Sequence, residues 1–327
     1  MHILITGAAG MIGRKLAARL VADAGLDGRP IEQLALLDVS APQRPENFNG
    51  RVELTVADLA DPTAARAAVA GRPDVIFHLA AIVSAEAELD FEKGMRVNFD
   101  GTRALLEAIR TAGESYRPRL VFASSIAVFG APFPEAIPDE FAPTPLTSYG
   151  TQKAMVELLL ADYTRRGFLN GVGVRLPNIV VRPGEPNKAA SGFFSSIIRE
   201  PLDGDDAVLP VDDGVRAWHA SPRAAVGFLM RAAALDGKEI APRVNLTMPG
   251  LCCTVAEQIA ALRRLAGDRV VARIRRVPDP LIARIVAGWP SRFDARRALA
   301  LGFRAETSFD EIIRIHIEDE LGGWIAN

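Results

Sequence analysis

Short runs of apolar residues alternate with amphipathic stretches through the first half of the chain. The first run covers residues 2–6, and a glycine-rich turn and leucines at helical spacing follow it. Similar runs, each ending in a polar residue, recur at 34–38, 52–58, 75–78 and 120–125. Parallel strands buried on both faces have continuous apolar sequences, and helices usually connect them. The pattern predicts an α/β fold with a doubly wound parallel sheet.

The alternation becomes irregular in the second half of the chain. Prolines there divide the sequence into shorter pieces, at Pro177, Pro183, Pro186, Pro201 and Pro210. Helical periodicity returns at 255–265 and again at 309–321. We therefore expect a sheet-containing domain at 1–170 and a smaller C-terminal region at 171–327, partly interleaved with the first.

Composition and charge exclude several classes of protein. The chain has 327 residues, of which 49% are hydrophobic, so it is neither a disordered tail nor a disulfide miniprotein. A formal net charge of −2 provides no general attraction to nucleic acid or anionic lipid, and we expect neither partner. The only cysteines, Cys252 and Cys253, are adjacent, which disfavours a disulfide and gives no zinc pattern. Without a secretion signal or a long apolar run, a cytoplasmic location is expected.

A glycine turn joins the first predicted strand to the first predicted helix. Gly7, Gly10 and Gly13 occupy this turn, with Met11 and Ile12 between the last two. Glycines let a backbone approach a pyrophosphate closely, and the N-terminus of a helix favours negative charge. This context is typical of a Rossmann dinucleotide-binding domain, although the spacing is GxxGxxG rather than GxGxxG.

Asp38 closes the second predicted strand. A carboxylate there accepts hydrogen bonds from both hydroxyls of an adenine ribose and repels a 2′-phosphate. Arg14 and Arg44 are the nearby basic residues that would favour NADP. We predict NAD, and the alternative reading is an ordinary exposed aspartate.

Other polar and small residues follow the next two predicted strands. Asp58 and Leu59 come after the third, and Ala80 and Ala81 come after the fourth. Ligands of open α/β sheets bind at the carboxyl ends of strands. These four residues are therefore predicted to lie against the cofactor.

Tyr149 is followed four residues later by Lys153, which places both side chains on one face of a helix. A phenol with an ordinary pKa of about 10 is a poor base at neutral pH, and a nearby ammonium lowers that pKa. Ser125, rather than Ser124, is the serine expected to hydrogen-bond the same substrate oxygen. Unless the pair is a surface coincidence, the three residues predict removal of a hydroxyl proton while a hydride leaves carbon.

Together these motifs resemble the extended short-chain dehydrogenases/reductases of the epimerase/dehydratase group over nearly the whole chain. The matching segments are 6–13, Asp38, 58–59, 78–81, Asn98 with 101–102, 124–130 and 149–153. The resemblance implies that Ser125 is the catalytic serine, Tyr149 the proton acceptor, and that Lys153 also binds the nicotinamide ribose. It further implies that Asn98 supports the sheet and the cofactor and that Pro177 belongs to the cofactor site.

Two departures from the sugar-nucleotide members disfavour a nucleotide-sugar substrate. The Gly-Pro that usually follows Asn178 is replaced by the run 179–184, and the Thr-Asp-Glu triplet of the dehydratases is replaced by 125–127. The segment 182–202 is similar to dehydrogenases that oxidise a four-carbon sugar acid at C2. The implied activity is NAD-dependent oxidation of D-erythronate to 2-oxo-D-erythronate.

A small sugar acid offers little apolar area, so its carboxylate must orient it through charge-assisted hydrogen bonds. We expect Arg182 or Arg216 to hold that carboxylate, and the sequence does not decide between them. The remaining residues predicted to contact the substrate are Ser84, Ser125, Tyr149, Asn178 and Ser191.

Two other functions stay open. A nucleotide-sugar epimerase would use the same serine, tyrosine and lysine but return the hydride to a bound ketone, so free NADH would not accumulate. A non-catalytic dinucleotide sensor would bind NAD without needing a base. Either way, the segments 149–163 and 101–110 resemble the dimerisation helices of the family and carry the apolar run 158–160, so we expect a homodimer.

Overall fold

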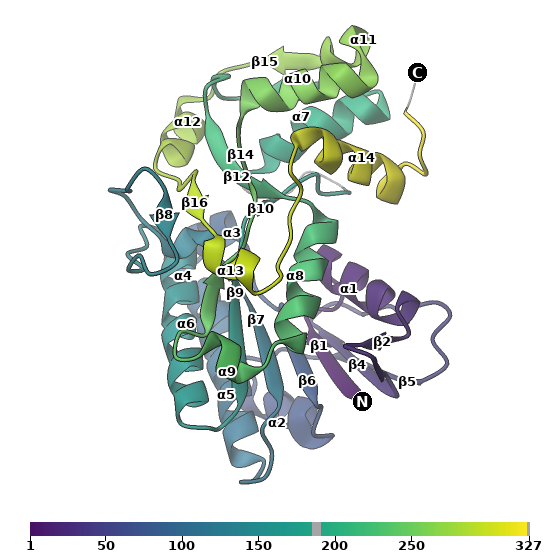
Figure 1. Cartoon of the computed structure of the whole chain (residues 1–327), viewed down its shortest axis with the longest axis vertical. Coiled ribbons are helices and arrows are strands. Elements are labelled where there is room, and N and C mark those ends of the chain that lie inside the picture. Colours follow the sequence, from purple (N-terminus) through teal and green to yellow (C-terminus); the bar gives the residue numbers. More distant parts are fainter. Residues whose placement is uncertain (185–190, 326–327) are drawn as a thin grey trace.

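The computed structural model describes residues 1–184 and 191–325. A seven-stranded sheet in the order β13-β9-β7-β6-β1-β4-β5 forms the main body, and all neighbouring strands are parallel (Figure 1). Its strands are β1 (His2–Thr6), β4 (Gln33–Asp38), β5 (Arg51–Val56), β6 (Val75–His78), β7 (Arg119–Ser125), β9 (Asn170–Leu176) and β13 (Asn245–Thr247). The predicted fold class is confirmed.

Helices cover both faces of this sheet, which explains its continuous apolar strands. On β1, the three consecutive residues Ile3, Leu4 and Ile5 are all buried, although successive side chains of a strand point to opposite faces of the sheet. Two helices pack against each other on one face, α1 (Met11–Ala22) and α8 (Pro222–Ala234). The other face carries α2 (Pro62–Ala70), α5 (Gly101–Thr111) and α6 (Ser148–Arg165). Burial from both sides selects apolar residues at every strand position.

Shorter elements lie at the rim of the sheet. A hairpin of β2 (Gly25–Leu26) and β3 (Arg29–Pro30) follows α1. Between β6 and α5 lie α3 (Ser84–Leu89), α4 (Phe91–Gly94) and a π-helical turn, η1 (Met95–Asp100). The 3₁₀ turn η2 (Ile126–Val128) follows β7, and α9 (Gly237–Ile240) follows α8.

A smaller region with its own apolar core lies above the carboxyl ends of the strands in Figure 1. One of its sheets has the order β10-β12-β14, formed by β10 (Asn178–Ile179), β12 (Arg216–Ala220) and β14 (Leu251–Thr254). A second pairs β11 (Ala207–Leu209) with β15 (Ile274–Arg276). Its helices are α7 (Gly192–Asp203), α10 (Val255–Ala266), α11 (Asp268–Val271), α12 (Pro280–Ala287) and α14 (Phe309–Glu320).

The chain passes between the two regions more than once. β9, which begins at residue 170, and β13, which follows much later, both belong to the main sheet, and α8 packs on that sheet. Near the C-terminus, β16 (Phe293–Asp294) pairs with β8 (Ile137–Pro138), and α13 (Arg296–Ala300) packs against β13. The regions are therefore interleaved, and a boundary at residue 170 does not separate them.

Within residues 1–184 and 191–325, no helix is both long and apolar enough to cross a membrane. The same part of the chain gathers no group of three or more histidine, cysteine, aspartate or glutamate side chains that would hold a metal ion.

Candidate active site

The glycine turn between β1 and α1 is shaped by close backbone contacts. Gly7 has φ +74°, and a Cβ atom there would lie 2.7 Å from the Ala80 nitrogen. A Cβ atom on Gly13 would lie 2.3 Å from the Gly7 oxygen. No side chain caps the start of α1 at Gly10, and its first turn contains no acidic residue. The N–H groups of this turn therefore suit a phosphate group.

Asp38 lies beside this turn at the end of β4. Its Oδ2 accepts a hydrogen bond from the Ala9 nitrogen (2.9 Å), and its Oδ1 accepts one from the Ser40 nitrogen (3.0 Å). A carboxylate has about four lone-pair positions, so two remain for ribose hydroxyls. Two backbone N–H groups therefore fix the orientation of the Asp38 carboxylate.

Asp58, Leu59 and Asn98 make contacts with neighbouring parts of the protein. Asp58 pairs with Arg96 and accepts a hydrogen bond from the Ala60 nitrogen, while Leu59 is buried. The side chain of Asn98 is tied to both backbone polar groups of Ile82. A further bond runs from Asn98 Nδ2 to Gln152 Oε1 (2.7 Å). Asn98 thus joins the loop after β6 to α6.

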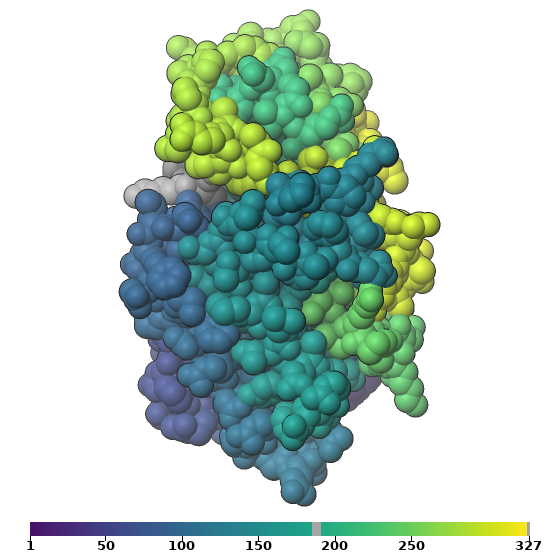
Figure 2. Space-filling model, turned by 90° about the vertical axis from the view of Figure 1, so that its left-hand side faces the viewer, coloured from purple at the N-terminus to yellow at the C-terminus, as the bar shows by residue number. Residues whose placement is uncertain are grey.

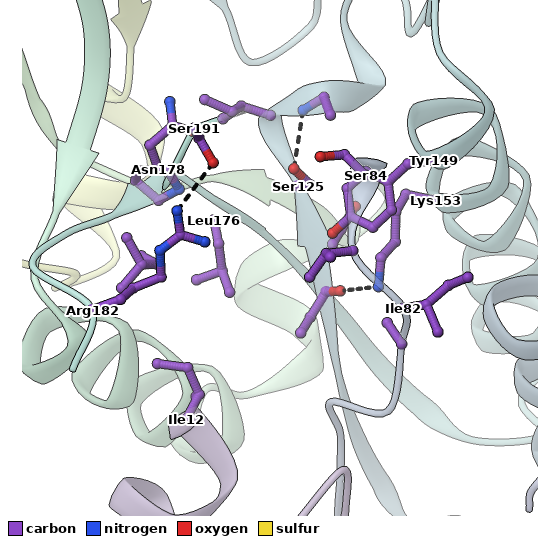
Figure 3. Close-up of a pocket in the computed structure, with 18 of the residues that line it drawn as sticks. Ile12, Ile82, Ser84, Ser125, Tyr149, Lys153, Leu176, Asn178, Arg182 and Ser191 are labelled. Carbon is purple, nitrogen blue, oxygen red and sulfur yellow. Dashed lines mark hydrogen bonds between the residues drawn. The ribbon is translucent and has the colours of Figure 1, made fainter. Parts of the chain in front are cut away.

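A cavity of about 520 Å³ extends from the glycine turn to the smaller region (Figure 3). It brings together most of the residues predicted from the sequence, namely Gly7, Gly10, Met11, Ile12, Gly13, Ala81, Ser84, Ser125, Tyr149, Lys153, Pro177, Asn178, Arg182 and Ser191. Asp38, Asp58, Leu59, Ala80, Asn98 and Arg216 are not among the residues that line it.

Tyr149 approaches Ser125 because two backbone segments pack closely. A Cβ atom on Gly150 would lie 2.1 Å from the Ala127 oxygen, so only glycine lets α6 begin against the η2 turn. Thr147 Oγ1 caps α6 by accepting a hydrogen bond from the Gly150 nitrogen (3.1 Å). Ser125 Oγ accepts one from the Ala127 nitrogen (3.1 Å). The hydroxyls of Ser125 and Tyr149 therefore face the same end of the cavity (Figure 3).

Lys153 lies one helical turn below Tyr149. Its Nζ donates a hydrogen bond to the Ala123 oxygen (2.8 Å) and lies 5.6 Å from the centre of the Tyr149 ring. Burial lowers the pKa of Lys153 to about 7, and the nearby Glu157 carboxylate opposes that shift. Burial also raises the pKa of Tyr149 to about 12, although the hydrogen bond with Ser125 opposes this shift. The pKa of Tyr149 therefore lies above its ordinary value rather than below it as expected, because burial outweighs the hydrogen bond with Ser125.

Glu157, one turn further along α6, anchors a buried polar network that was not anticipated from the sequence. Its carboxylate accepts hydrogen bonds from Ser124 Oγ (2.6 Å) and Arg175 Nη2 (2.8 Å). The side chains of Glu157 and Arg175 are only 2% and 6% exposed. Both serines line the cavity, but the Ser124 hydroxyl already donates a hydrogen bond to Glu157. The spacing Tyr149, Lys153, Glu157 is the signal that marks this position.

The opposite wall of the cavity contains Arg182, Ser191 and Asn178 (Figure 3). An Nη2 hydrogen of Arg182 is donated to Ser191 Oγ (3.2 Å). Asn178 lies on β10, where it pairs with His219 of β12.

Arg216 is not brought to the cavity. It is exposed at the other end of β12, three residues before His219 and hence roughly 10 Å away along the strand. Its strand partner is Thr254, so the pairing of β12 places it away from Asn178. Arg182 is the one of the two predicted arginines that lines the cavity.

Sequence reasoning missed several lining residues from the smaller region. Arg199 on α7 and Trp289 after α12 both reach the cavity. Arg199 follows Ser191 and Ser195 at four-residue intervals, a pattern that places the three on one helical face. No comparable signal marks Trp289.

A parallel sheet, a glycine turn before α1, an aspartate that closes β4 and a Ser/Tyr/Lys group define a dinucleotide-dependent short-chain dehydrogenase/reductase. Residues 3–221 match the model of the NAD dependent epimerase/dehydratase family. The chain belongs to this family, and its cofactor is NAD.

The full-length relatives are named either as dehydrogenases or as an epimerase. The chain is 48% identical to the D-erythronate dehydrogenase of Cupriavidus necator over 324 residues, or 98% of each chain. It is 42% identical to the D-erythronate dehydrogenase of Haemophilus influenzae over 321 residues, covering 98% of this chain and all of that one. The crystal structure of a nucleoside-diphosphate-sugar epimerase from Agrobacterium tumefaciens is similar with a TM-score of 0.97 and 62% identity, covering 99% of this chain and 95% of that one.

Proposed function

We propose that this chain oxidises D-erythronate at C2 to 2-oxo-D-erythronate with NAD as hydride acceptor. Arg182 carries the proposal: it lines the cavity across from Ser125 and Tyr149, and no carboxylate among the described residues pairs with it. A partly buried guanidinium that has no carboxylate partner within residues 1–184 and 191–325 favours an anionic ligand. Identity of 48% and 42% with D-erythronate dehydrogenases supports this particular acid.

Three side chains carry out the proposed proton transfer. The Tyr149 phenolate oxygen accepts the C2 hydroxyl proton and becomes a phenol, and Ser125 orients the same C2 oxygen. Lys153 stabilises the phenolate and holds the nicotinamide ribose. When bound, NAD supplies the acceptor for the C2 hydride, so that C2 becomes a ketone. Because the phenolate must form, the elevated pKa of Tyr149 requires stabilisation by its neighbours.

We assign the rest of the NAD site to the residues around the glycine turn. Gly7, Gly10 and Gly13 allow the pyrophosphate to approach the start of α1, where Met11 and Ile12 provide N–H groups. Asp38 binds the adenine ribose. The remaining residues assigned to this site, as lining or support, are Asp58, Leu59, Ala80, Ala81, Asn98 and Pro177.

The substrate proposal is tested by incubating the purified protein with NAD and a panel of four- to six-carbon sugar acids. The near-ultraviolet absorbance of NADH reports turnover. We expect free NADH to accumulate, with the highest kcat/KM for D-erythronate. If no acid in the panel yields NADH, the proposed function is wrong.

A nucleotide-sugar epimerase is the second candidate, because the similar Agrobacterium tumefaciens protein carries that name. Such an enzyme would regenerate NAD in every cycle, so nucleotide sugars would be interconverted without free NADH. A non-catalytic sensor would give neither result and would not need the Ser125, Tyr149 and Lys153 arrangement.

Cofactor preference tests the role of Asp38. We expect the wild type to prefer NAD over NADP by more than about tenfold, since a phosphate beside Asp38 costs more than about 1.4 kcal/mol. Asp38→Ala should narrow this preference without abolishing turnover. The measurement is kcat/KM for both cofactors, and equal use of both by the wild type would refute the assignment.

A homodimer is proposed through α5 and α6. Of the three consecutive leucines on α6, Leu160 is fully buried and Leu159 is partly buried, while Leu158 is 72% exposed. Of these three leucines, only Leu158 therefore supplies an exposed apolar side chain. Figure 2 shows the molecule from the side on which the teal part of the chain is exposed. We expect sedimentation of a dimer for the wild type and of a monomer for Leu158→Asp. Leu281→Asp, at an exposed position on α12, is the control, and a concentration-independent wild-type monomer would contradict the proposal.

A further inference from the structure

Three residues spaced four apart, Ser191 directly before α7 and Ser195 and Arg199 within it, each bind a different group of Arg182. Ser191 Oγ accepts a hydrogen bond from the Arg182 guanidinium (3.2 Å), and Ser195 Oγ accepts one from the Arg182 backbone nitrogen (3.1 Å). Arg199 Nη1 donates a hydrogen bond to the Arg182 backbone oxygen (2.5 Å). One face of α7 therefore fixes the side chain, the N–H and the carbonyl of the same residue, of which Figure 3 shows the first contact.

The two residues that bind the Arg182 backbone are buried. Ser195 is 1% exposed and Arg199 is 7% exposed. Because both bind the backbone of Arg182, they determine where its side chain begins and in which direction it can extend. A guanidinium held in advance loses less conformational freedom when it binds a ligand, which favours affinity.

Glu200 reduces the positive charge around these three contacts. Arg199 Nη2 lies 2.7 Å from Glu200 Oε1, and the two side chains are 8% and 18% exposed. The Glu200 carboxylate therefore offsets the charge of Arg199. Burial lowers the pKa of Arg182, and the Arg199 charge lowers it further, as expected for two cations close together in a poorly solvated site.

We propose that Ser195 and Arg199 are positioning residues that fix Arg182 as a carboxylate receptor, and that Glu200 lowers the positive charge of this receptor by offsetting Arg199. This inference rests on the proposed function and specifies the charge of its substrate. A monoanionic acid matches the receptor. A dicarboxylate of the same length, such as tartrate, brings a second charge that loses its hydration on binding, and Glu200 already offsets the charge of the neighbouring Arg199.

The positioning roles of Ser195 and Arg199 are tested with Ser195→Ala and Arg199→Met. Each should raise KM for D-erythronate about tenfold, as Arg182→Ala should, while kcat changes less than about threefold and KM for NAD stays constant. Arg199→Lys keeps the charge and a donor and should recover part of the loss. Thermal unfolding of each variant reports whether it is folded. If Ser195→Ala and Arg199→Met fold but have the wild-type KM, the positioning roles are wrong.

The effect of Glu200 on the charge of the receptor is tested with Glu200→Gln. Asp205→Asn is the matched control, because Asp205 is exposed beyond the end of α7. Glycerate and tartrate are used as probes, and their binding is measured on the protein loaded with NADH. Glu200→Gln should strengthen tartrate binding relative to glycerate by about fivefold or more, because the added net charge acts twice on a dianion. An unchanged ratio, or an equal change in Asp205→Asn, would overturn the role of Glu200.

These binding measurements do not depend on which acid is oxidised. If the wild type binds glycerate but produces no NADH from any sugar acid, the proposed function fails while the receptor remains. If D-erythronate is oxidised and the α7 variants behave as wild type, the receptor fails alone.

Discussion

Replacing Tyr149 by phenylalanine is expected to lower kcat for acid oxidation by at least about 10²-fold, with folding and NAD binding nearly unchanged. The substitution removes the phenol oxygen that, once ionised, accepts the substrate proton, but keeps the ring that packs near Lys153. Initial rates of NADH formation give kcat, and a binding titration with NADH gives cofactor affinity.

Tyr116→Phe is the matched control, because that buried hydroxyl donates to the Pro73 oxygen (2.9 Å) and does not line the cavity. It should retain wild-type turnover. Because burial raises the pKa of Tyr149 to about 12, a larger fraction of the phenol is ionised as pH rises. Oxidation by the wild type should therefore accelerate towards alkaline pH, and Tyr149→Phe should lose that dependence. A Tyr149→Phe variant with near wild-type turnover would contradict the assignment.

Replacing Glu157 by alanine is expected to lower the free energy of unfolding by about 3–5 kcal/mol. The change leaves the buried Arg175 guanidinium without its carboxylate and Ser124 without its acceptor. An uncompensated buried charge is far more destabilising than the loss of a surface ion pair. Denaturant unfolding measures the difference.

Asp162→Ala is the control for this substitution. Asp162 lies on the same helix and pairs with Arg165, but the two side chains are 56% and 70% exposed. Its removal should change stability by about 0–1 kcal/mol. Equal losses for Glu157→Ala and Asp162→Ala would show that the buried network does not stabilise the fold.

The local chemistry of this protein can be recognised in its sequence. The apolar runs at 2–6 and 75–78 correspond to β1 and β6, since strands between two helical layers need apolar residues at every position. The glycine turn depends on backbone geometry confined to a few neighbouring residues, and Tyr149 with Lys153 depends on the period of one helix. Short-range patterns of this kind were enough to predict the fold class, the family and NAD.

Tertiary structure decided what depends on contacts between distant segments. Arg182 and Arg216 were equivalent in sequence, and only the pairing of β12 with β10 and β14 separates them. The elevated pKa of Tyr149 follows from burial by several elements, and no spacing along the chain reports it. The same holds for the boundary near residue 170, because β9 and β13 return to the sheet after it. Periodicity shows which face of an element is apolar, whereas the packing of elements determines which faces meet and which charges lose their water.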